Sequence, residues 1–152
     1  MPLVRTRAAY ELVQADILAN TPDKFIESCL AQYLAVIFYA EMEERVTEII
    51  SSHLKRFTGS RIGQFLTANM DHMIGRVPKS DMARLLGLLG EEFKQKFNGL
   101  IEEREVSIYS NIIQARHNIG HKHGSEIEIS EIMPAIEAAD KILSALDKCF
   151  LD

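Results

Sequence analysis

The feature that most constrains this chain is a helical pattern that runs without interruption from Pro22 to Phe57. Apolar residues recur there every three or four positions, and after Pro22 the stretch contains neither glycine nor proline. This spacing is typical of an amphipathic α-helix, whereas a half-buried strand alternates apolar and polar residues. A straight helix of this extent is roughly 50 Å long. The pattern therefore predicts a helical spine against which the rest of the chain packs.

The other segments repeat the same periodicity. Thr21 is expected to cap the long helix with Pro22 as its first residue, and Ser130 to cap the last helix with Pro134 in its first turn. Only residues 125–130 alternate, which predicts a short extended connector. The sequence thus predicts an all-α bundle of about five to six helices in a single domain, 1–152. Besides the long second helix, the expected helices cover 3–19, 60–74, 81–97, 100–119 and 131–150.

Composition narrows the class of protein. With 47% apolar residues, the chain can bury one substantial core. No run of purely apolar residues reaches the ~18 needed for a membrane span, and no secretory signal is seen, so we expect a cytoplasmic protein with no membrane partner. Cys29 and Cys149 are expected to be buried free thiols. The net charge of −5 argues against sequence-independent binding to long nucleic acid and leaves room for one local basic pocket.

The segment from Gln114 to Gly124 concentrates the chemistry. It holds an arginine, a lysine and three of the five histidines. Arg116 and His121 are about 140° apart on an unbroken helix, so they cannot face one phosphate unless the helix ends between them. Gly120 can leave the helical conformation without a Cβ penalty, which lets His121 turn toward Arg116. The pair then offers a permanent cation and a proton carrier that works near neutral pH.

This Arg-x4-His spacing before a loop resembles the signature of the HEPN superfamily, small helical bundles that include many RNA-cleaving toxins and defence nucleases. The order arginine, polar residue, any residue, isoleucine, small residue, histidine is most similar to the RiboL-PSP type. Two positions depart from family patterns. Lys122 stands where glycine usually follows the histidine, and His123 stands where toxins paired with nucleotidyltransferase antitoxins carry a modifiable tyrosine.

The resemblance implies a metal-independent endoribonuclease without a cofactor. Arg116 and His121 are the implied catalytic pair, and Glu43 on the long helix is the acidic residue expected to orient one of them. The implied contacts to RNA are His117, Asn118, Lys122 and His123. Cleavage of single-stranded RNA then follows from attack of the 2′-oxygen on the adjacent phosphorus, with Arg116 stabilising the oxyanions.

The resemblance also implies partners. These are the RNA substrate, an antitoxin protein and a second copy of the chain. Because one Arg and one His make a sparse site in an acidic protein, we expect a homodimer with a composite cleft. Its interface is expected to include residues 116–123 and part of the second helix.

Other interpretations stay open at this stage. Arg116 can instead pair with a glutamate at the end of the bundle, and Glu41, Glu43, Glu44 and Arg45 can form a solvated charged patch. His117, His121 and His123 can supply three imidazoles to a metal ion. A non-catalytic HEPN-like module that binds a protein or a nucleotide is the alternative function. Finally, Tyr33, Tyr39 and Tyr109 are expected in the core more readily than stacked on a base.

Overall fold

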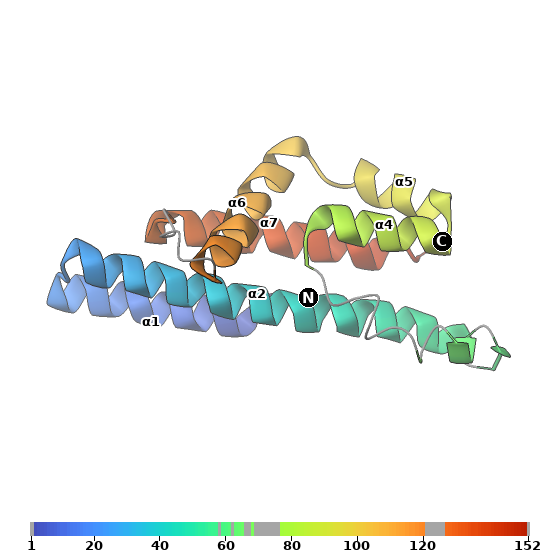
Figure 1. Cartoon of the computed structure of the whole chain (residues 1–152), viewed down its shortest axis with the longest axis horizontal. Coiled ribbons are helices and arrows are strands. Elements are labelled where there is room, and N and C mark those ends of the chain that lie inside the picture. Colours follow the sequence, from blue (N-terminus) through green and yellow to red (C-terminus); the bar gives the residue numbers. More distant parts are fainter. Residues whose placement is uncertain are drawn as a thin grey trace.

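The computed structural model describes residues 2–57, 59–61, 63–65, 68, 77–120 and 127–151, and the regular structure in these ranges is helical throughout (Figure 1). This confirms the predicted all-α bundle with a long second helix. The elements are α1 (Val4–Asn20), α2 (Lys24–Leu54), the 3-10 helix η1 (Lys55–Phe57), α4 (Lys79–Leu89), α5 (Glu91–Gly99), α6 (Glu103–Gly120) and α7 (Ile129–Lys148).

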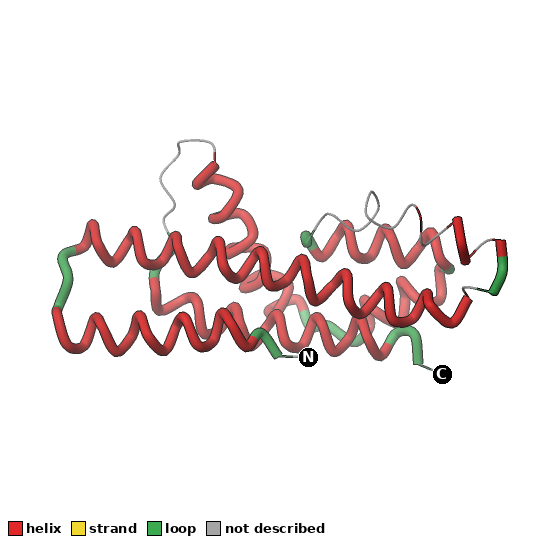
Figure 2. The backbone as a smooth tube through the Cα atoms, turned by 90° about the horizontal axis from the view of Figure 1, so that it is seen from below, coloured by secondary structure: helices red, strands yellow, loops and turns green. Residues whose placement is uncertain are grey.

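The spine of the molecule is an antiparallel hairpin of α1 and α2. Helix α7 runs along this hairpin, α6 crosses it, and α4 and α5 lie on the side of α7 that faces away from α1 (Figures 1 and 2). Helix α2 contacts α1, α6 and α7. The core is therefore the space between α2 and the two C-terminal helices. Its largest buried side chains include Phe38, Met42, Ile49, Phe97, Tyr109 and Ile132.

The first turn of α1 is held by carboxylates from other helices. The amides of Arg5 and Thr6 donate to the buried Glu41 of α2 at 3.0 and 2.7 Å, and the Thr6 hydroxyl donates to the same carboxylate at 2.7 Å. From α7, Asp140 accepts the Leu3 amide at 3.1 Å. Because first-turn amides have no partner within their own helix, these bonds take the place of a local cap.

The boundary between α1 and α2 differs from the prediction. Thr21 has a left-handed backbone (φ 44°) and its amide bonds to the Ile17 carbonyl at 2.9 Å, so it closes α1 instead of opening α2. Asp23 is the actual N-cap of α2, since its carboxylate accepts the Ile26 amide at 2.9 Å. The predicted cap at Thr21 and helical start at Pro22 were therefore wrong by two residues.

Two further helix predictions need correction. The stretch 81–97, expected as one helix, is split at Gly90, whose extended backbone separates α4 from α5. Helix α7 begins at Ile129, where the Glu128 amide donates to Glu131 at 2.8 Å in a capping box, so Ser130 is not the cap. Pro134 consequently lies in the second turn, where it removes one helical hydrogen bond.

Two segments fall partly outside the described ranges. In the predicted helix 60–74, residues 61, 63–65 and 68 are helical, and the other positions from 62 onward are not described. In the predicted connector, Ile127 and Glu128 are non-helical as expected, and Ile129 and Ser130 already belong to α7. Positions 125 and 126 are not described.

Both cysteines are free thiols, as predicted. Cys149 is buried and its thiol donates to the Leu146 carbonyl at 3.0 Å, and burial raises its pKa to about 11. Cys29 is exposed on α2, so its predicted burial was wrong. It lies on the side of α2 that no described helix covers.

Among the helices in the described ranges, α2 is long and apolar enough to cross a membrane by length and composition. Its most apolar window has a mean hydropathy of 1.2 and is 33% buried inside the protein. A core helix has the same composition, and α2 does pack against three other helices.

Candidate active site

Helix α6 separates its residues into a core face and an open face. Tyr109, Ile112 and Ala115 are buried against the bundle, whereas Arg116 and His117 are exposed near the helix end. Successive buried positions are three residues apart, which keeps them on one side of the helix. Arg116, directly after the last of them, lies at the edge where α6 meets α2.

The Arg116 guanidinium lies over the ring of Tyr39 from α2, with its central carbon 4.5 Å from the ring centroid. This is the geometry of a cation–π contact, which orients the guanidinium plane without neutralising its charge. The two residues border a cavity of about 210 Å³, whose other lining residues are Pro78, Ile113, Gln114 and His117. The cavity thus combines a fixed cation, an imidazole and an aromatic wall.

The wall of this cavity is anchored in the core. The Tyr109 hydroxyl donates to the carbonyl of Val77 at 2.7 Å, which fixes the segment that leads into Pro78. The Tyr109 ring also contacts Phe38, with centroids 6.0 Å apart. Burial raises the pKa of Tyr109 well above its usual value, so this hydroxyl stays protonated and keeps its donor role. Its predicted core position is confirmed.

The other two tyrosines behave differently. Tyr39 is half-buried and its ring supports Arg116, a contact that the sequence did not reveal because it joins two helices far apart in the chain. Tyr33 is 57% exposed, so its predicted core position was wrong.

Arg116 has no carboxylate partner among the described residues. By contrast, ion pairs with aspartate or glutamate hold Arg5, Arg7, Arg45 and Arg84. The interpretation of Arg116 as a cap that pairs with a glutamate therefore finds no support in the described part of the chain. Its charge is open to solvent and to an anion.

Glu43 is exposed one helical turn beyond Tyr39, about 40° from it around α2. It thus lies on the side of α2 that faces the Arg116 cavity, but no hydrogen bond or ion pair joins it to Arg116 in the described structure. Its role as an orienting group stays a prediction.

The fully buried carboxylate of this helix is Glu41, which faces α1. Burial alone raises the pKa of Glu41, but the hydrogen bonds from Arg5 and Thr6 outweigh that effect, so the pKa lies below its usual value. The interpretation of this stretch as a solvated patch is wrong for Glu41, whereas Glu43 and Glu44 are indeed exposed. Glu44 pairs with Arg5 at 2.5 Å.

The remaining predicted site residues lie on both sides of Gly120, the last described residue of α6. His117 lines the cavity, and Asn118 accepts a hydrogen bond from the Gln114 side chain at 3.0 Å. His121, Lys122 and His123 lie outside the described residues. Within the described ranges, no group of three histidine, cysteine or acidic residues could hold a metal ion. The three-histidine metal alternative includes two undescribed residues and stays untested.

A second cluster of reactive side chains lies between the end of α2 and the end of α7. His53 is buried, its Nε2 is 2.7 Å from Asp147, and its ring stacks on Phe150. Cys149 belongs to the same region of α7, but its raised pKa keeps the thiol protonated and unreactive. The sequence did not predict this histidine–aspartate pair, which has the features of a structural contact.

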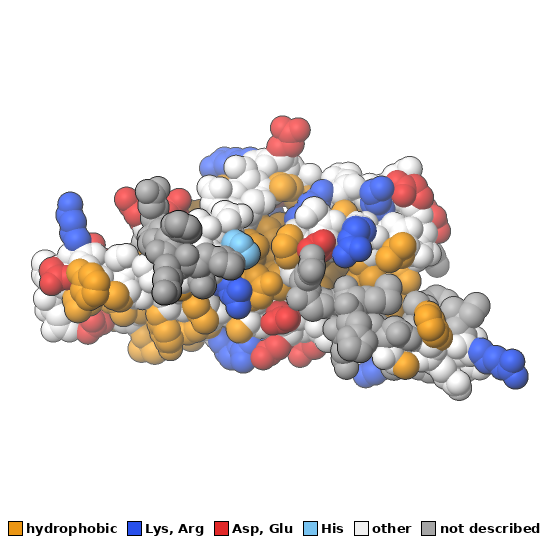
Figure 3. Space-filling view, in the orientation of Figure 1, with side chains coloured by type: hydrophobic (Ala, Val, Ile, Leu, Met, Phe, Trp, Pro, Cys, Tyr) orange, Lys and Arg blue, Asp and Glu red, His pale blue; other side chains and the backbone are white. Residues whose placement is uncertain are grey.

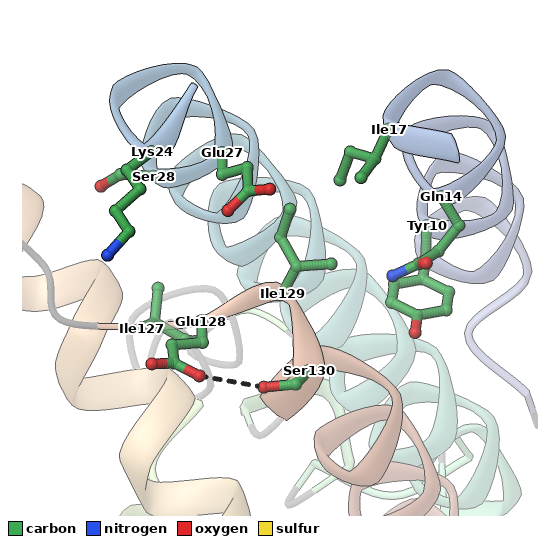
Figure 4. Close-up of a pocket in the computed structure, with 10 residues that line it drawn as sticks. All are labelled: Tyr10, Gln14, Ile17, Lys24, Glu27, Ser28, Ile127, Glu128, Ile129 and Ser130. Carbon is green, nitrogen blue, oxygen red and sulfur yellow. Dashed lines mark hydrogen bonds between the residues drawn. The ribbon is translucent and has the colours of Figure 1, made fainter. Parts of the chain in front are cut away.

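A second and larger cavity, of about 680 Å³, is a groove between the hairpin and the start of α7 (Figure 4). Tyr10, Gln14 and Ile17 border it on the α1 side, and Glu128 and Ser130 on the α7 side share a hydrogen bond of 3.2 Å. None of its lining residues also lines the Arg116 cavity. Among the described residues on the surface visible in Figure 3, the side chains around the molecule's centre carry scattered charges of both signs and form no continuous basic area.

No protein-family model matches the chain, and no curated protein or solved structure resembles it at a significant level.

Proposed function

We propose that this protein is a metal-independent endoribonuclease of the HEPN type that cleaves single-stranded RNA. The observation that carries the proposal is the Arg116 guanidinium, exposed, stacked on Tyr39 and without a carboxylate partner among the described residues. An arginine in this state can bind a phosphate through its planar fork of donors. The Arg-x4-His resemblance supplies the reaction class.

The reaction needs few groups. A base removes the proton of the 2′-hydroxyl, the 2′-oxygen bonds to the adjacent phosphorus, and the bond from phosphorus to the 5′-oxygen breaks as that oxygen takes up a proton. The products are a 2′,3′-cyclic phosphate and a 5′-hydroxyl. In the proposal His121 exchanges these protons and Arg116 stabilises the charge that develops on the phosphoryl oxygens.

The cavity supports particular roles for its other residues. Its rim places the His117 imidazole beside Arg116, where it can contact a neighbouring phosphate or base. Tyr39 is occupied by the guanidinium, so its proposed role is to position Arg116. Asn118, Lys122 and His123 follow on the same segment and complete the proposed contacts to RNA.

The test is cleavage of a single-stranded RNA by the purified protein in excess EDTA. Arg116→Ala and His121→Ala should each abolish cleavage, and the products of the wild type should carry 2′,3′-cyclic phosphate ends. Arg104→Ala is the matched control, because Arg104 is an exposed arginine at the other end of α6. Cleavage that survives both site substitutions would refute the proposal. Activity that appears only with a divalent metal would favour the three-histidine metal site.

In cells, we propose a cytoplasmic toxin or defence effector restrained by an antitoxin. Expression of the wild type alone should slow growth, and Arg116→Ala should remove the defect. If both are harmless and neither cleaves RNA, the non-catalytic binding module becomes the better description. The composite cleft between two copies stays a prediction, to be tested by mixing Arg116→Ala and His121→Ala chains and measuring whether activity returns.

A further inference from the structure

The α1–α2 hairpin carries two exposed apolar rows with coiled-coil spacing. The steps along each row alternate between three and four residues, as in a heptad repeat. Leu12 is 73% exposed and Tyr33 is 57% exposed, so both rows face outward from the core. The row on α1 is Ala8, Leu12, Ala15 and Ala19, and the row on α2 is Ile26, Cys29, Tyr33, Val36 and Ala40.

The two rows lie on the same side of the hairpin. On α1, Arg7 reaches Asp140 of α7, whereas Arg5 reaches Glu44 of α2 at 2.5 Å. At 100° per residue, Leu12 is only about 20° from Arg5 around α1, and Tyr33 is only about 20° from Glu44 around α2. The ion pair between Arg5 and Glu44 therefore joins the two rows at one end. We call the nine residues of these rows the outer face.

No described helix covers the outer face. Figure 1 shows the hairpin along the lower edge of the molecule, and Figure 2, seen from below, shows it with no other described helix in front. In Figure 3, apolar side chains gather along the same edge. Helix α2 has no charged residue between Glu27 and Glu41, so the α2 row of the outer face offers an occupant uncharged and mostly apolar contacts.

The size of the outer face suits a protein partner. Its four large side chains, Leu12, Tyr33, Val36 and Ile26, are 73%, 57%, 46% and 45% exposed, and a contiguous set of exposed apolar side chains is typical of a surface that binds a protein. The rim carries the exposed acidic residues Glu11, Asp16 and Asp23. A membrane-surface helix is instead rich in Lys and Arg around its apolar face, so an anionic bilayer is the less suitable occupant.

The outer face is complementary to itself. Its α1 row is mostly alanine, and its α2 row carries the bulky Ile26, Tyr33 and Val36. A two-fold axis parallel to the hairpin places the α2 row of one copy over the α1 row of the other. The bonds between Thr6 and Glu41 fix the register of the hairpin, and counting from them places Tyr33 level with Gln14, so that Ala15 is the nearest residue of the α1 row. Each Tyr33 ring would then pack on the partner's Ala15.

We propose that the outer face binds a second copy of this chain, so that two hairpins form a four-helix bundle. The proposal does not depend on the ribonuclease activity. Tyr39, which carries Arg116, is about 120° from Tyr33 around α2, so each copy keeps its own Arg116 cavity outside this interface. The outer face is thus a different surface from the composite cleft predicted from the sequence, and the two dimers are alternatives.

Sedimentation of the full chain across micromolar concentrations tests the proposal. The wild type should be a dimer. Leu12→Glu and Tyr33→Glu should each weaken the dimer at least tenfold, because each buries an unpaired charge. Leu88→Glu is the matched control, since Leu88 is 67% exposed on α4, away from the outer face, and this variant should stay dimeric. Circular dichroism verifies that every variant is helical.

A crosslink keeps the proposal testable if the glutamate variants fail to fold. In a Cys29→Ser background, Ala15→Cys with Tyr33→Cys should give a disulfide-linked dimer on a non-reducing gel. A wild type that stays monomeric, a dimer that survives both glutamate substitutions, or a double-cysteine chain without an intermolecular crosslink would each overturn the proposal. A monomer that co-sediments with phosphatidylglycerol vesicles would assign the outer face to a membrane instead.

Discussion

Replacing Glu41 with alanine should destabilise the protein more than any other change of a charged residue on α2. The substitution removes one acceptor group but leaves three donors without partners, namely the Arg5 amide and the amide and hydroxyl of Thr6. Each buried donor that loses its acceptor costs about 1–3 kcal/mol, less whatever entering water restores. We expect a loss of about 3–4 kcal/mol, a large share of the ~5–15 kcal/mol that stabilises a typical domain.

Urea denaturation followed by far-UV circular dichroism measures this loss. Glu43→Ala is the matched control two residues away, and because Glu43 is exposed its cost should be within about 0.5 kcal/mol. The loss of stability for Glu41→Gln should fall between the two, at about 2 kcal/mol. The glutamine side chain keeps one acceptor oxygen for one backbone amide of α1, but it presents its own N–H donors to the second backbone amide. Equal unfolding free energies for Glu41→Ala and Glu43→Ala would refute the assignment of Glu41 as the clamp on α1.

The same carboxylate sets a pH dependence. Because the pKa of Glu41 is lower in the folded protein than in the unfolded chain, its contribution is complete above the unfolded pKa of about 4.3. It is lost as the pH falls through the lower, folded value. The wild type should therefore lose stability between neutral and acidic pH more steeply than Glu41→Gln. Parallel curves for the two proteins would contradict the sign of the shift.

Three other predictions concern the Arg116 cavity, its support and the buried thiol of Cys149. Tyr109→Phe removes the donor to the Val77 carbonyl and should cost about 1–2 kcal/mol in the same urea assay, with no change for a control Tyr10→Phe. Tyr39→Leu should lower RNA cleavage several-fold by freeing Arg116, whereas Tyr39→Phe, which keeps the ring, should retain it; equal activities would remove Tyr39 from the site. Thiol labelling at neutral pH should modify Cys149 only when the protein unfolds. The Cys29→Ser variant leaves Cys149 as the one thiol, and its rapid modification in the folded variant would contradict the burial of Cys149.

The sequence predicted the fold class because helical periodicity is a local property. The uninterrupted pattern of α2 and the buried positions of α6 follow directly from the spacing of apolar residues. The ends of the helices were harder to predict from the sequence, since they depend on competing local hydrogen bonds. Thr21 and Asp23 are both good caps, and the choice between them depends on the bond from the Thr21 amide to Ile17 and the bond from the Ile26 amide to Asp23. Gly90 is a residue type that can end a helix, but a single glycine is often tolerated within one, so the break between α4 and α5 was not predicted.

Which of the two glutamates of α2, Glu41 or Glu43, is buried could not be predicted from the sequence. Glu41 and Glu43 are two positions apart, and their burial depends on which side of α2 receives α1. That side is fixed by contacts between residues more than thirty positions apart, such as the bond from Thr6 to Glu41. The contact between Arg116 and Tyr39 is longer in range still. The candidate arginine could be found by motif, but its aromatic support could not.

The carboxylates that close the start of α1 also bear on the order of events during synthesis. The Leu3 amide and the Arg7 guanidinium both bond to Asp140, more than 130 residues later in the chain. A ribosome therefore releases α1 and α2 well before the residue that completes the first turn of α1 exists. When the hairpin emerges, the Leu3 amide and the Arg7 guanidinium are still hydrated and the apolar residues of its core-facing side are exposed to water. The N-terminal helix should thus reach its final protection from hydrogen exchange only after α7 has docked, and a nascent chain stalled before Asp140 should exchange the Leu3 amide freely.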